Sequence, residues 1–290
     1  MFNSTFLDSV VIFGASGYIG YTLRQELESL EILVRSPSSI DIDLTNSFSV
    51  DQMTKYFSPT TAIIFSACIS PDRGSNSKIF LDNIYMAYHL AEAIKKRAPA
   101  YLVYISANGV YEDNQSPCLE SVLPAPQSLY GMMHLSREFI LGQICRDVGI
   151  PMMVLRPGSV YGPLDLHNYY GPTRFLRTAV NNGYIELFGD GEELRDYVYI
   201  QDVVKVICLC LKKQTIGILN ISSGQPKTFK EISNIIVRLL KNTIVVRSQP
   251  RPIGRNISNR YISNKKLLET FPELKFFSIE DGILQMLKDK

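Results

Sequence analysis

A glycine-rich turn near the start of the chain restricts the possible folds more than any other feature. It reads Gly14-Ala15-Ser16-Gly17-Tyr18-Ile19-Gly20 and directly follows residues 9–13, an apolar run whose branched residues are typical of a buried strand. After the turn, apolar residues recur at the three- and four-residue steps of an amphipathic helix, at Ile19, Leu23, Leu27 and Leu30. A strand that enters a helix through such a turn indicates the opening of a β-α-β unit.

The three glycines of this turn serve different physical purposes. Gly14 permits the tight turn, Gly17 lets backbone amides approach a ligand, and Gly20 lets the helix pack closely on the strand. The positive end of the helix dipole faces the turn, so the turn suits the pyrophosphate of a dinucleotide better than it suits a purely structural role. We therefore predict a set of cofactor contacts within the turn, made by Gly14, Ser16, Gly17, Tyr18, Ile19 and Gly20.

Strands and helical patterns alternate through the first half of the chain. Apolar runs predict further strands at residues 31–35, 61–67, 101–106 and 152–156. Helical patterns occupy residues 81–97, which Pro99 closes, and residues 128–146. This alternation predicts an α/β protein with a doubly wound parallel sheet, the Rossmann class, covered by helices on both faces.

The alternation becomes less regular after Arg156. Loop-rich stretches at 157–172 and 181–196 interrupt it, although residues 217–221 again have the pattern of a strand. We therefore expect a dinucleotide-binding domain at 1–156 and a smaller C-terminal substrate lobe at 157–290. Some segments of the lobe are expected to return to the main sheet.

Composition disfavours several other classes of protein. The chain has 290 residues, 46% of them apolar, and its 30 basic and 28 acidic residues leave a net charge of +2. This balance argues against a nucleic-acid partner, and the absence of an apolar run of about 18 residues argues against a membrane span. Residues 1–5 do not resemble a signal peptide, and the five cysteines and three histidines are scattered. We expect a cytoplasmic protein without a metal site.

Taken together, the motifs resemble those of the extended short-chain dehydrogenase/reductases, in the NAD-dependent epimerase/dehydratase family that modifies nucleotide-activated sugars. Beside the glycine turn, the similarity rests on motifs in the same order along nearly the whole chain: Ile42-Asp43-Leu44, Phe65-Ser66-Ala67-Cys68, the stretch 106–111, Tyr130-Gly131, Leu155-Arg156-Pro157, and the stretches 188–197 and 219–224. The resemblance implies that Asp43 and Leu44 lie at the adenine. It also implies that Ser66, Ala67 and Pro157 line the cofactor site.

The residue that ends the second strand bears on the choice of coenzyme. An acidic residue at this place favours NAD, because it accepts hydrogen bonds from the ribose hydroxyls and repels a 2′-phosphate. Here the sequence has Arg35, followed by Ser36. A guanidinium can hold a phosphate with two parallel hydrogen bonds, so we favour NADP over NAD. The alternative is that Arg35 is a solvated turn residue.

The resemblance also implies a catalytic Tyr and Lys four residues apart on one helix, with a Ser or Thr opposite. Tyr130 matches the Tyr, but His134 stands at the Lys position and Ala107 at the Ser/Thr position. An imidazole with an ordinary pKa near 6.5 is largely uncharged at neutral pH, so His134 would acidify the phenol less than Lys does. We expect Tyr130 to exchange the proton and His134 to hold the cofactor, the alternative being two structural side chains.

Ala107 cannot give the substrate the hydrogen bond that the family's Ser or Thr provides. Either of its neighbours, Ser106 or Asn108, could supply this hydrogen bond instead. Ser106 is the weaker candidate. If the strand at 101–106 continues through Ala107, the side chains of Ser106 and Ala107 point to opposite faces of the sheet. The pair Asn108-Gly109 stands where dehydratases of the family carry Asp-Glu, which disfavours dehydration because that reaction needs a carboxylic acid. The NADP preference in turn favours a keto reductase over a 4-epimerase, which retains its NAD.

The second half of the chain contains the expected substrate contacts. By the resemblance, Arg195 clamps the diphosphate of a nucleotide sugar, unless it pairs with a nearby carboxylate. Ser159 stands where many relatives have Asn, and Arg174 and Arg255 are either further phosphate contacts or solvated residues. Residues 163–170 are either a loop over the sugar or an ordinary surface loop.

We therefore expect an NAD(P)-dependent oxidoreductase that reduces a keto group of a nucleotide-activated sugar. The alternatives are a nucleotide-sugar 4-epimerase with bound NAD and a dinucleotide-binding protein with little catalysis, which the departures at His134 and Ala107 would explain. The resemblance further implies a homodimer formed through the helices at 81–97 and 129–146.

Overall fold

The computed structural model of the chain describes residues 7–113, 116–165, 171–241, 243–251, 257 and 259–288. The chain divides into two compact units, which are described separately. Unit 1 comprises residues 1–112, 123–156 and 204–219, and unit 2 comprises residues 113–122, 157–203 and 220–290.

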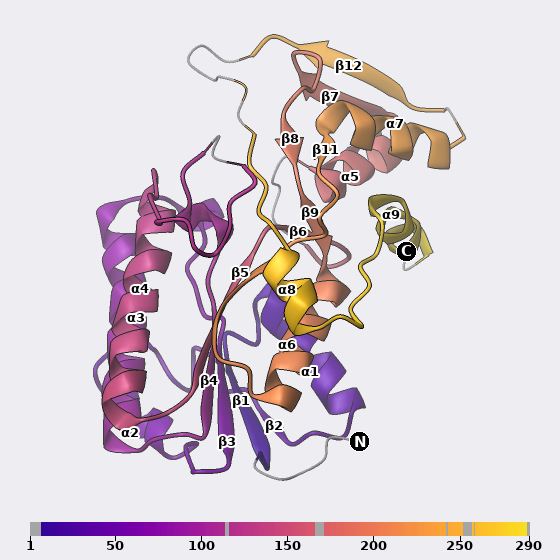
Figure 1. Cartoon of the computed structure of the whole chain (residues 1–290). Coiled ribbons are helices and arrows are strands. Elements are labelled where there is room, and N and C mark those ends of the chain that lie inside the picture. Colours follow the sequence, from indigo (N-terminus) through magenta and orange to yellow (C-terminus); the bar gives the residue numbers. More distant parts are fainter. Residues whose placement is uncertain are drawn as a thin grey trace. The chain divides into compact units, whose positions relative to one another are not determined.

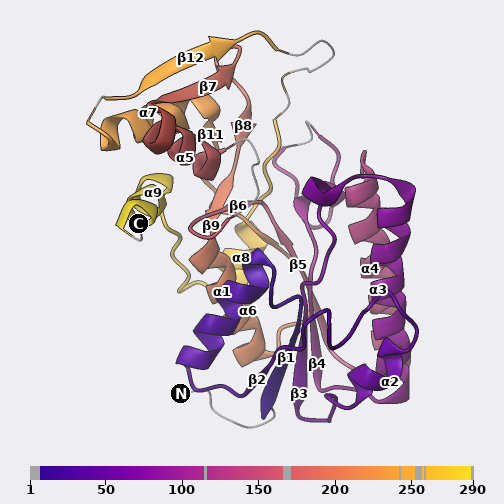
Figure 2. The ribbon, with the colours of Figure 1, turned by 180° about the vertical axis from the view of Figure 1, so that it is seen from behind.

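A six-stranded sheet forms the centre of unit 1, in the order β10-β5-β4-β3-β1-β2 (Figures 1 and 2). The pairings from β2 to β5 are all parallel. The sheet strands have these bounds: β1 Ser9–Phe13, β2 Val34–Arg35, β3 Thr61–Phe65, β4 Tyr101–Ile105, β5 Met152–Pro157 and β10 Gly217–Ile221. The predicted doubly wound α/β class is confirmed.

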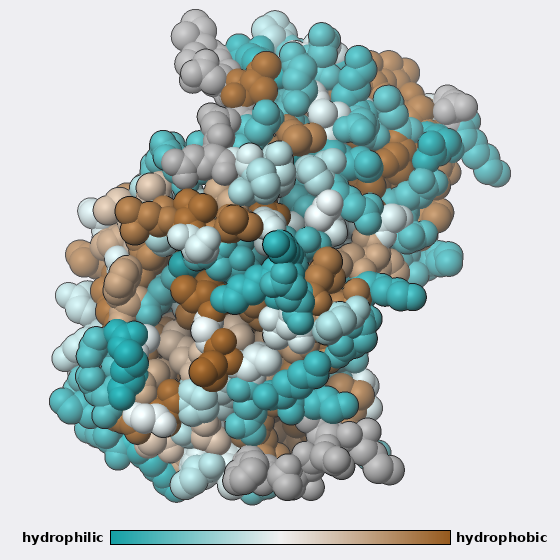
Figure 3. Space-filling model, in the orientation of Figure 1, coloured by the Kyte–Doolittle hydropathy of each residue, from teal (hydrophilic) through white to brown (hydrophobic). Residues whose placement is uncertain are grey.

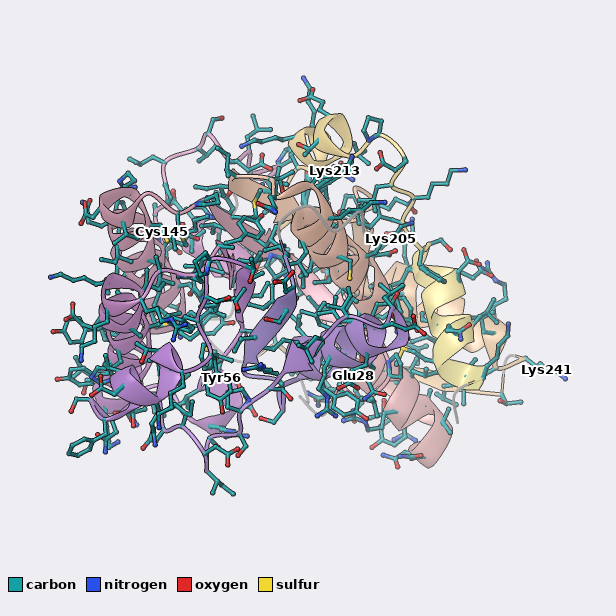
Figure 4. The ribbon with its side chains drawn as sticks, turned by 90° about the horizontal axis from the view of Figure 1, so that it is seen from below. Glu28, Tyr56, Cys145, Lys205, Lys213 and Lys241 are labelled. Carbon is teal, nitrogen blue, oxygen red and sulfur yellow. The ribbon has the colours of Figure 1, made fainter. Side chains whose placement is uncertain are left out.

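Helices cover both faces of this sheet. In Figure 4, Glu28 on α1 and Lys205 on α6 lie on one side of the strands, and Tyr56 and Cys145 lie on the other. The helices that contribute to unit 1 have these bounds: α1 Tyr18–Ser29, α2 Ser49–Thr54, α3 Ser77–Lys96, α4 Leu129–Val148 and α6 Ile200–Lys213, with 3-10 turns η1 Pro71–Arg73 and η2 Asn108–Val110.

The main core of unit 1 lies between the sheet and helices α2, α3 and α4. Alternate residues of the central strands point into it, among them Val11, Phe13, Ile63, Phe65, Leu102 and Tyr104. They pack against the apolar stripes of the helices, which include Leu90, Ile94 and Leu141. Because the strands are buried on both faces, nearly every residue in them is apolar, which explains why the sequence shows continuous apolar runs there.

Two elements differ from their predicted bounds for local reasons. Strand β2 has only residues 34 and 35, because the chain leaves α1 through Glu31 at φ +58° and an Ile32 N–H that donates to the Leu27 carbonyl (3.0 Å). Helix α3 begins at Ser77, four residues before the predicted start. Asn76 caps it, since its side chain accepts a hydrogen bond from the Ile79 amide (2.9 Å).

The chain order of the sheet reverses between β1 and β3. From β1 the chain goes to β2 on one side, and then crosses to β3, β4 and β5 on the other. In such sheets ligands bind outside the carboxyl ends of the strands at the reversal. At this place the sheet ends in the glycine turn after β1 and in residues 66–70 after β3.

In its described residues, unit 2 has three two-stranded pairs and short helices. Strand β6 pairs with β9 and β7 with β12 in parallel, and β8 pairs with β11 in antiparallel. The bounds are β6 Ser159–Tyr161, β7 Tyr184–Phe188, β8 Leu194–Arg195, β9 Tyr197–Tyr199, β11 Lys227–Thr228, β12 Val245–Gln249, α5 Pro172–Asn182, α7 Phe229–Leu239, α8 Lys265–Thr270 and α9 Ile279–Lys288. Within the described residues, none of the helices has the length and apolar character needed to cross a membrane.

Candidate cofactor and active site

The glycine turn is closely packed against its surroundings. Gly14 has φ +98°, and a Cβ atom there would lie 2.4 Å from the Ala67 amide nitrogen. A Cβ atom on Gly20 would lie 2.2 Å from the Gly14 carbonyl oxygen. Both positions therefore require glycine, the first for its backbone conformation as well as for space.

The first turn of α1 is suited to an anionic ligand. Gly17 is the N-cap residue, so no side chain accepts hydrogen bonds from the first amides of the helix. These amides have no carbonyl partner within a helix, and the dipole adds partial positive charge. Ser16 and Gly17 are exposed, which leaves the turn accessible. The Gly17 amide already donates to the Gly14 carbonyl (3.0 Å), so a dinucleotide pyrophosphate fits this turn with the amides of residues 18–20 as its donors.

The loop after β3 lies next to this turn. The Ser66 amide donates to the Phe13 carbonyl (2.9 Å), and the Ser66 hydroxyl donates to the same oxygen (3.1 Å). Further along, Asn83 on α3 holds Ile69 from both sides, by accepting from its amide (3.0 Å) and donating to its carbonyl (3.1 Å). The loop 66–69 is thus attached to β1 and to α3. The sequence analysis did not single out Asn83, although a buried Asn within an apolar helix stripe was a usable signal.

The predicted adenine contacts lie on the other side of the turn. Arg35 is exposed at the last residue of β2, and its neighbour in the sheet is Val11. The Asp43 carboxylate is also exposed and accepts hydrogen bonds from the amide (3.0 Å) and hydroxyl (2.7 Å) of Thr45. The Leu44 carbonyl accepts from Nδ1 of His89 (2.8 Å), which holds this segment against α3.

Tyr130 is the second residue of α4. Ser128 caps the helix by accepting a hydrogen bond from the Gly131 amide (3.1 Å). Gly131 lies against Gly109 so closely that a Cβ atom on it would come within 2.0 Å of the Gly109 carbonyl. This approach brings the Asn108-Gly109 segment beside Tyr130, at the carboxyl end of β4. A pocket of unit 1 borders the same tyrosine, with walls from α3, α4 and the loop after β3.

His134 lies one helical turn after Tyr130, and its ring packs edge-on against the phenol ring with centroids 4.6 Å apart. The imidazole is 2% exposed. Its Nδ1 lies 2.7 Å from the Tyr104 hydroxyl, and its Nε2 has no hydrogen-bond partner among the described residues. Burial and the charge of Arg137 lower the pKa of His134 well below its ordinary value, so the imidazole is neutral at pH 7.

Ser106 belongs to a buried network of charged side chains. Its hydroxyl donates to Oε1 of Glu138 (2.6 Å), and the same carboxylate receives two hydrogen bonds from Arg156. The remaining guanidinium nitrogen of Arg156, Nη1, donates to the Tyr111 hydroxyl (2.8 Å). Of the two candidates for the substrate hydrogen bond, Asn108 is therefore the one outside this network. The sequence analysis did not identify Glu138, which lies one turn beyond His134 on the same face of α4.

The predicted substrate contacts belong to unit 2, apart from Arg255, which lies outside the described residues. Arg195 lines a pocket together with Tyr197, Ser223, Gln225, Lys227 and Ile279. It donates to the Leu194 carbonyl (2.9 Å), and burial lowers its pKa from the ordinary value. Ser159 begins β6, and Arg174 is half-buried in the first turn of α5.

Helix α6 carries two cysteines, Cys208 and Cys210. Cys210 is buried and Cys208 is half-buried. Burial raises the pKa of Cys210 to about 11 and that of Cys208 to about 12, so both stay protonated thiols at pH 7. In the part of the chain that the structure describes, no group of His, Cys, Asp and Glu side chains could hold a metal ion.

A family profile matches the segment that carries this geometry. It is described as the NAD dependent epimerase/dehydratase family, and it covers residues 10–222, from β1 through β10. The chain belongs to this family. The membership predicted from the motifs is thereby confirmed, and with it the expectation of an enzyme.

Similar proteins agree with this membership. An uncharacterized UDP-glucose epimerase, YtcB of Bacillus subtilis, is 30% identical over 156 residues, which are 53% of this chain and 49% of that protein. The dTDP-4-dehydro-6-deoxyglucose reductase of Escherichia coli is 23% identical and covers 97% of both chains. The chain thus spans about half of the first relative and nearly all of the second.

A solved structure supports the fold. The UDP-glucose 4-epimerase of Thermotoga maritima, determined with UDP-glucose, has a TM-score of 0.83 and covers 97% of both chains at 20% identity. At this identity the likeness shows the fold alone. It extends over unit 1 and unit 2, so the architecture of the whole chain is that of the family.

Proposed function

We propose that the protein is an NAD(P)-dependent oxidoreductase that reduces a keto group of a nucleotide-activated sugar. The observation that most supports this function is the position of Tyr130 at the start of α4, where it packs on His134 and lies beside the Asn108-Gly109 segment. A phenol at the carboxyl end of the sheet can donate a proton to a carbonyl oxygen as that oxygen gains charge. The similarity to the E. coli reductase over nearly the full length supports this choice.

In this proposal the chain's residues bind and orient the cofactor, which supplies hydride when bound. The amides of residues 18–20 hold its pyrophosphate, and the loop 66–69 borders its nicotinamide half. Pro157, the last residue of β5, is proposed as a further cofactor contact. His134 donates to a ribose hydroxyl from Nε2. Tyr130 transfers the proton at its phenol oxygen, and Asn108 donates to the carbonyl oxygen of the sugar.

We favour NADPH as the coenzyme, because Arg35 ends β2 as an exposed cation where an acidic residue would repel a 2′-phosphate. The test compares NADPH and NADH affinities in wild type and Arg35→Ser. We expect the variant to lose about tenfold in NADPH affinity and to keep its NADH affinity. An equal effect on both coenzymes would remove Arg35 from the discrimination.

The nucleotide sugar is proposed to bind through unit 2. Arg195 and Lys227 place two cations in one pocket, whereas the hydroxyl of Ser223 in its wall donates to Asp196 (2.7 Å). Such a pair of cations is suited to a diphosphate. Ser159 and Arg174 are proposed as lesser contacts. The activity itself is tested by supplying NADPH with a nucleotide 4-keto-6-deoxy sugar and following the loss of NADPH absorbance. Absence of turnover with several such sugars would reject the reductase.

A 4-epimerase with retained NAD is the second candidate, because the Bacillus and Thermotoga relatives carry epimerase names. Protein purified without added coenzyme distinguishes the two. An epimerase would release bound NAD on denaturation and interconvert UDP-glucose and UDP-galactose. A reductase would do neither.

A third candidate, dinucleotide binding with little turnover, is favoured by the bonding of Ser106 to Glu138 and by the neutral state of His134. A charged lysine at position 134 and a hydroxyl free to bond the substrate would assist proton transfer from Tyr130. The neutral His134 and the bonded Ser106 give Tyr130 less of this assistance. Coenzyme binding without turnover of either class of sugar would establish it.

We also propose that two copies associate through α3 and α4 in the cytoplasm. These helices expose several large apolar or aromatic side chains: Leu81, Tyr85, Tyr88, Leu129, Met132 and Phe139. The left side of the molecule, where α3 and α4 lie, carries brown, hydrophobic atoms in Figure 3. A surface of this kind is typical of an interface. Light scattering should give the mass of a dimer for wild type and of a monomer for Phe139→Lys with Leu81→Lys.

A further inference from the structure

Arg137 on α4 is a buried cation without a carboxylate partner. Its side chain is fully buried, and no Asp or Glu among the described residues forms an ion pair with it. The next buried arginine, Arg156, is by contrast paired with Glu138 in two hydrogen bonds. An unpaired buried charge is costly, and proteins retain one mainly where it has a task.

The contacts of Arg137 lead to the candidate site. One terminal nitrogen donates to the carbonyl of Ala67, in the loop after β3 (2.8 Å), and the other lies 3.7 Å from the Met133 sulfur. The guanidinium carbon lies 4.3 Å from the centre of the Phe65 ring. The Nε atom of Arg137 has no hydrogen-bond partner within the described ranges of the chain. These contacts orient the group without neutralising it, so its charge acts on the polar groups nearby.

Tyr104 connects Arg137 to His134. Burial raises the pKa of Tyr104, and the positive charge of Arg137, whose guanidinium carbon lies 5.5 Å from the centre of the Tyr104 ring, offsets this only in part. The phenol therefore keeps its proton. Its oxygen lies 2.7 Å from Nδ1 of His134, which is neutral. A neutral imidazole has one donor and one acceptor nitrogen, so the hydrogen bond can run in either direction.

Arg137 selects one of these directions. If Nδ1–H donated to Tyr104, the phenol oxygen near the Arg137 cation would carry its own proton and face a second one from His134, and its O–H would have no acceptor among the described residues. If the phenol donates to Nδ1, its O–H has an acceptor and its oxygen keeps its lone pairs toward the cation. The proton of the imidazole then resides on Nε2. That atom is buried and has no hydrogen-bond partner in the part of the chain that the structure describes.

We propose that Arg137 is a positioning residue which, through Tyr104, holds His134 as the Nε2–H tautomer and so makes it a hydrogen-bond donor toward an oxygen of the bound dinucleotide. In this arrangement a buried cation, Arg137, orients a neutral imidazole at the position where the family usually has a charged lysine. That lysine contacts the ligand directly. The inference rests on the proposed function only for the identity of the ligand.

The tautomer can be measured in the ligand-free protein by long-range proton–nitrogen correlation NMR on imidazole-labelled histidine. His89 is an internal reference for the opposite tautomer, because its Nδ1 must donate to the Leu44 carbonyl (2.8 Å). His134→Gln and His89→Gln assign the signals. We expect His134 to show a protonated Nε2 and an unprotonated Nδ1. The Nδ1–H tautomer, or a time-averaged pair of signals, would overturn the proposal.

Variants then test the role of Arg137. In Arg137→Met the His134 signals should move toward the average of the two tautomers, and Arg137→Lys should restore a single tautomer. Arg146→Met, an exposed arginine on the same helix, should change neither. If Arg137→Met does not fold, Tyr104→Phe removes the connecting hydroxyl and should give the same averaging. An unchanged Nε2–H signal in the folded variant would refute the role of Arg137.

Ligand affinity gives the second readout, with NADH and NADPH as the probes. Arg137→Met should weaken the preferred coenzyme about tenfold, and Arg146→Met should leave it within about twofold. Equal affinity of Arg137→Met and wild type would overturn the proposal. If wild type binds neither coenzyme, the proposed function fails, while the tautomer measurements on the free protein still decide whether Arg137 orients His134.

Discussion

Nη2 of Arg156 lies 2.6 Å from Oε2 of Glu138, and its Nε lies 2.9 Å from Oε1 of the same carboxylate. This bidentate pair joins β5 to α4 in the interior of unit 1. The pair also forms hydrogen bonds with two hydroxyls that border the segment beside Tyr130: Glu138 accepts from Ser106, and Arg156 donates to Tyr111. The pair thus holds the end of β4 and the helix of the candidate catalytic tyrosine in one arrangement.

Removing one member of this pair should destabilise the protein strongly. Arg156→Met leaves the Glu138 carboxylate buried without its cation, so the free energy of unfolding should fall by about 3–5 kcal/mol in urea denaturation. The double variant Arg156→Met with Glu138→Leu should recover most of this loss, since no charge is then left unpaired. Arg146→Met is the control and should change stability by less than about 0.5 kcal/mol. A single variant as stable as the control would contradict this account.

Tyr130→Phe should separate binding from chemistry. The variant lacks the proton donor, so turnover should fall about 10²–10⁴-fold, while coenzyme affinity stays within about twofold because the ring remains packed on His134. The measurements are steady-state kcat and the Kd for NADPH. Tyr56→Phe, located after α2, is the matched control. Retained turnover in Tyr130→Phe would exclude the phenol from the reaction.

Gly14→Ala and Gly217→Ala compare two glycines with similar backbone strain and different surroundings. Both have positive φ, +98° and +102°, but only a Cβ on Gly14 would meet backbone atoms, whereas nothing lies within 4 Å at Gly217. Gly217→Ala should cost about 1–2 kcal/mol of unfolding free energy from strain alone. Gly14→Ala should cost more by a further ~1–3 kcal/mol and should also weaken coenzyme binding. Equal losses in thermal or urea unfolding would contradict the close packing of the turn.

The neutral, buried His134 should make stability fall in acid. Its pKa is lowered in the folded state, so the unfolded chain binds more protons as the pH drops below the ordinary histidine value near 6.5. Stability is therefore complete above that pH and declines below it. Thermal unfolding of wild type and His134→Gln between pH 8 and pH 5 measures this, and the variant should show the flatter profile. Parallel profiles would mean that His134 does not titrate on unfolding.

The sequence by itself determined the opening β-α-β unit, the alternating elements of the sheet and the family. Each of these depends on short-range information. Gly14 and Gly20 mark positions that permit no side chain, and the spacing of Leu23 and Leu27 shows the buried face of α1. Motifs in a set order along the chain were enough to indicate the family, because each motif is read within a few residues.

Only the tertiary structure decided which polar groups meet. Ser106 and Glu138 are 32 residues apart, and Tyr104 and His134 are 30 residues apart. Whether they touch depends on the register of β4 and on the packing of α4 across the sheet, which no local pattern specifies. The same holds for Arg137, which looks like an ordinary helical arginine in the sequence. Its burial against the loop after β3 follows from the three-dimensional packing, because helix and strand positions become neighbours only when both elements are in place.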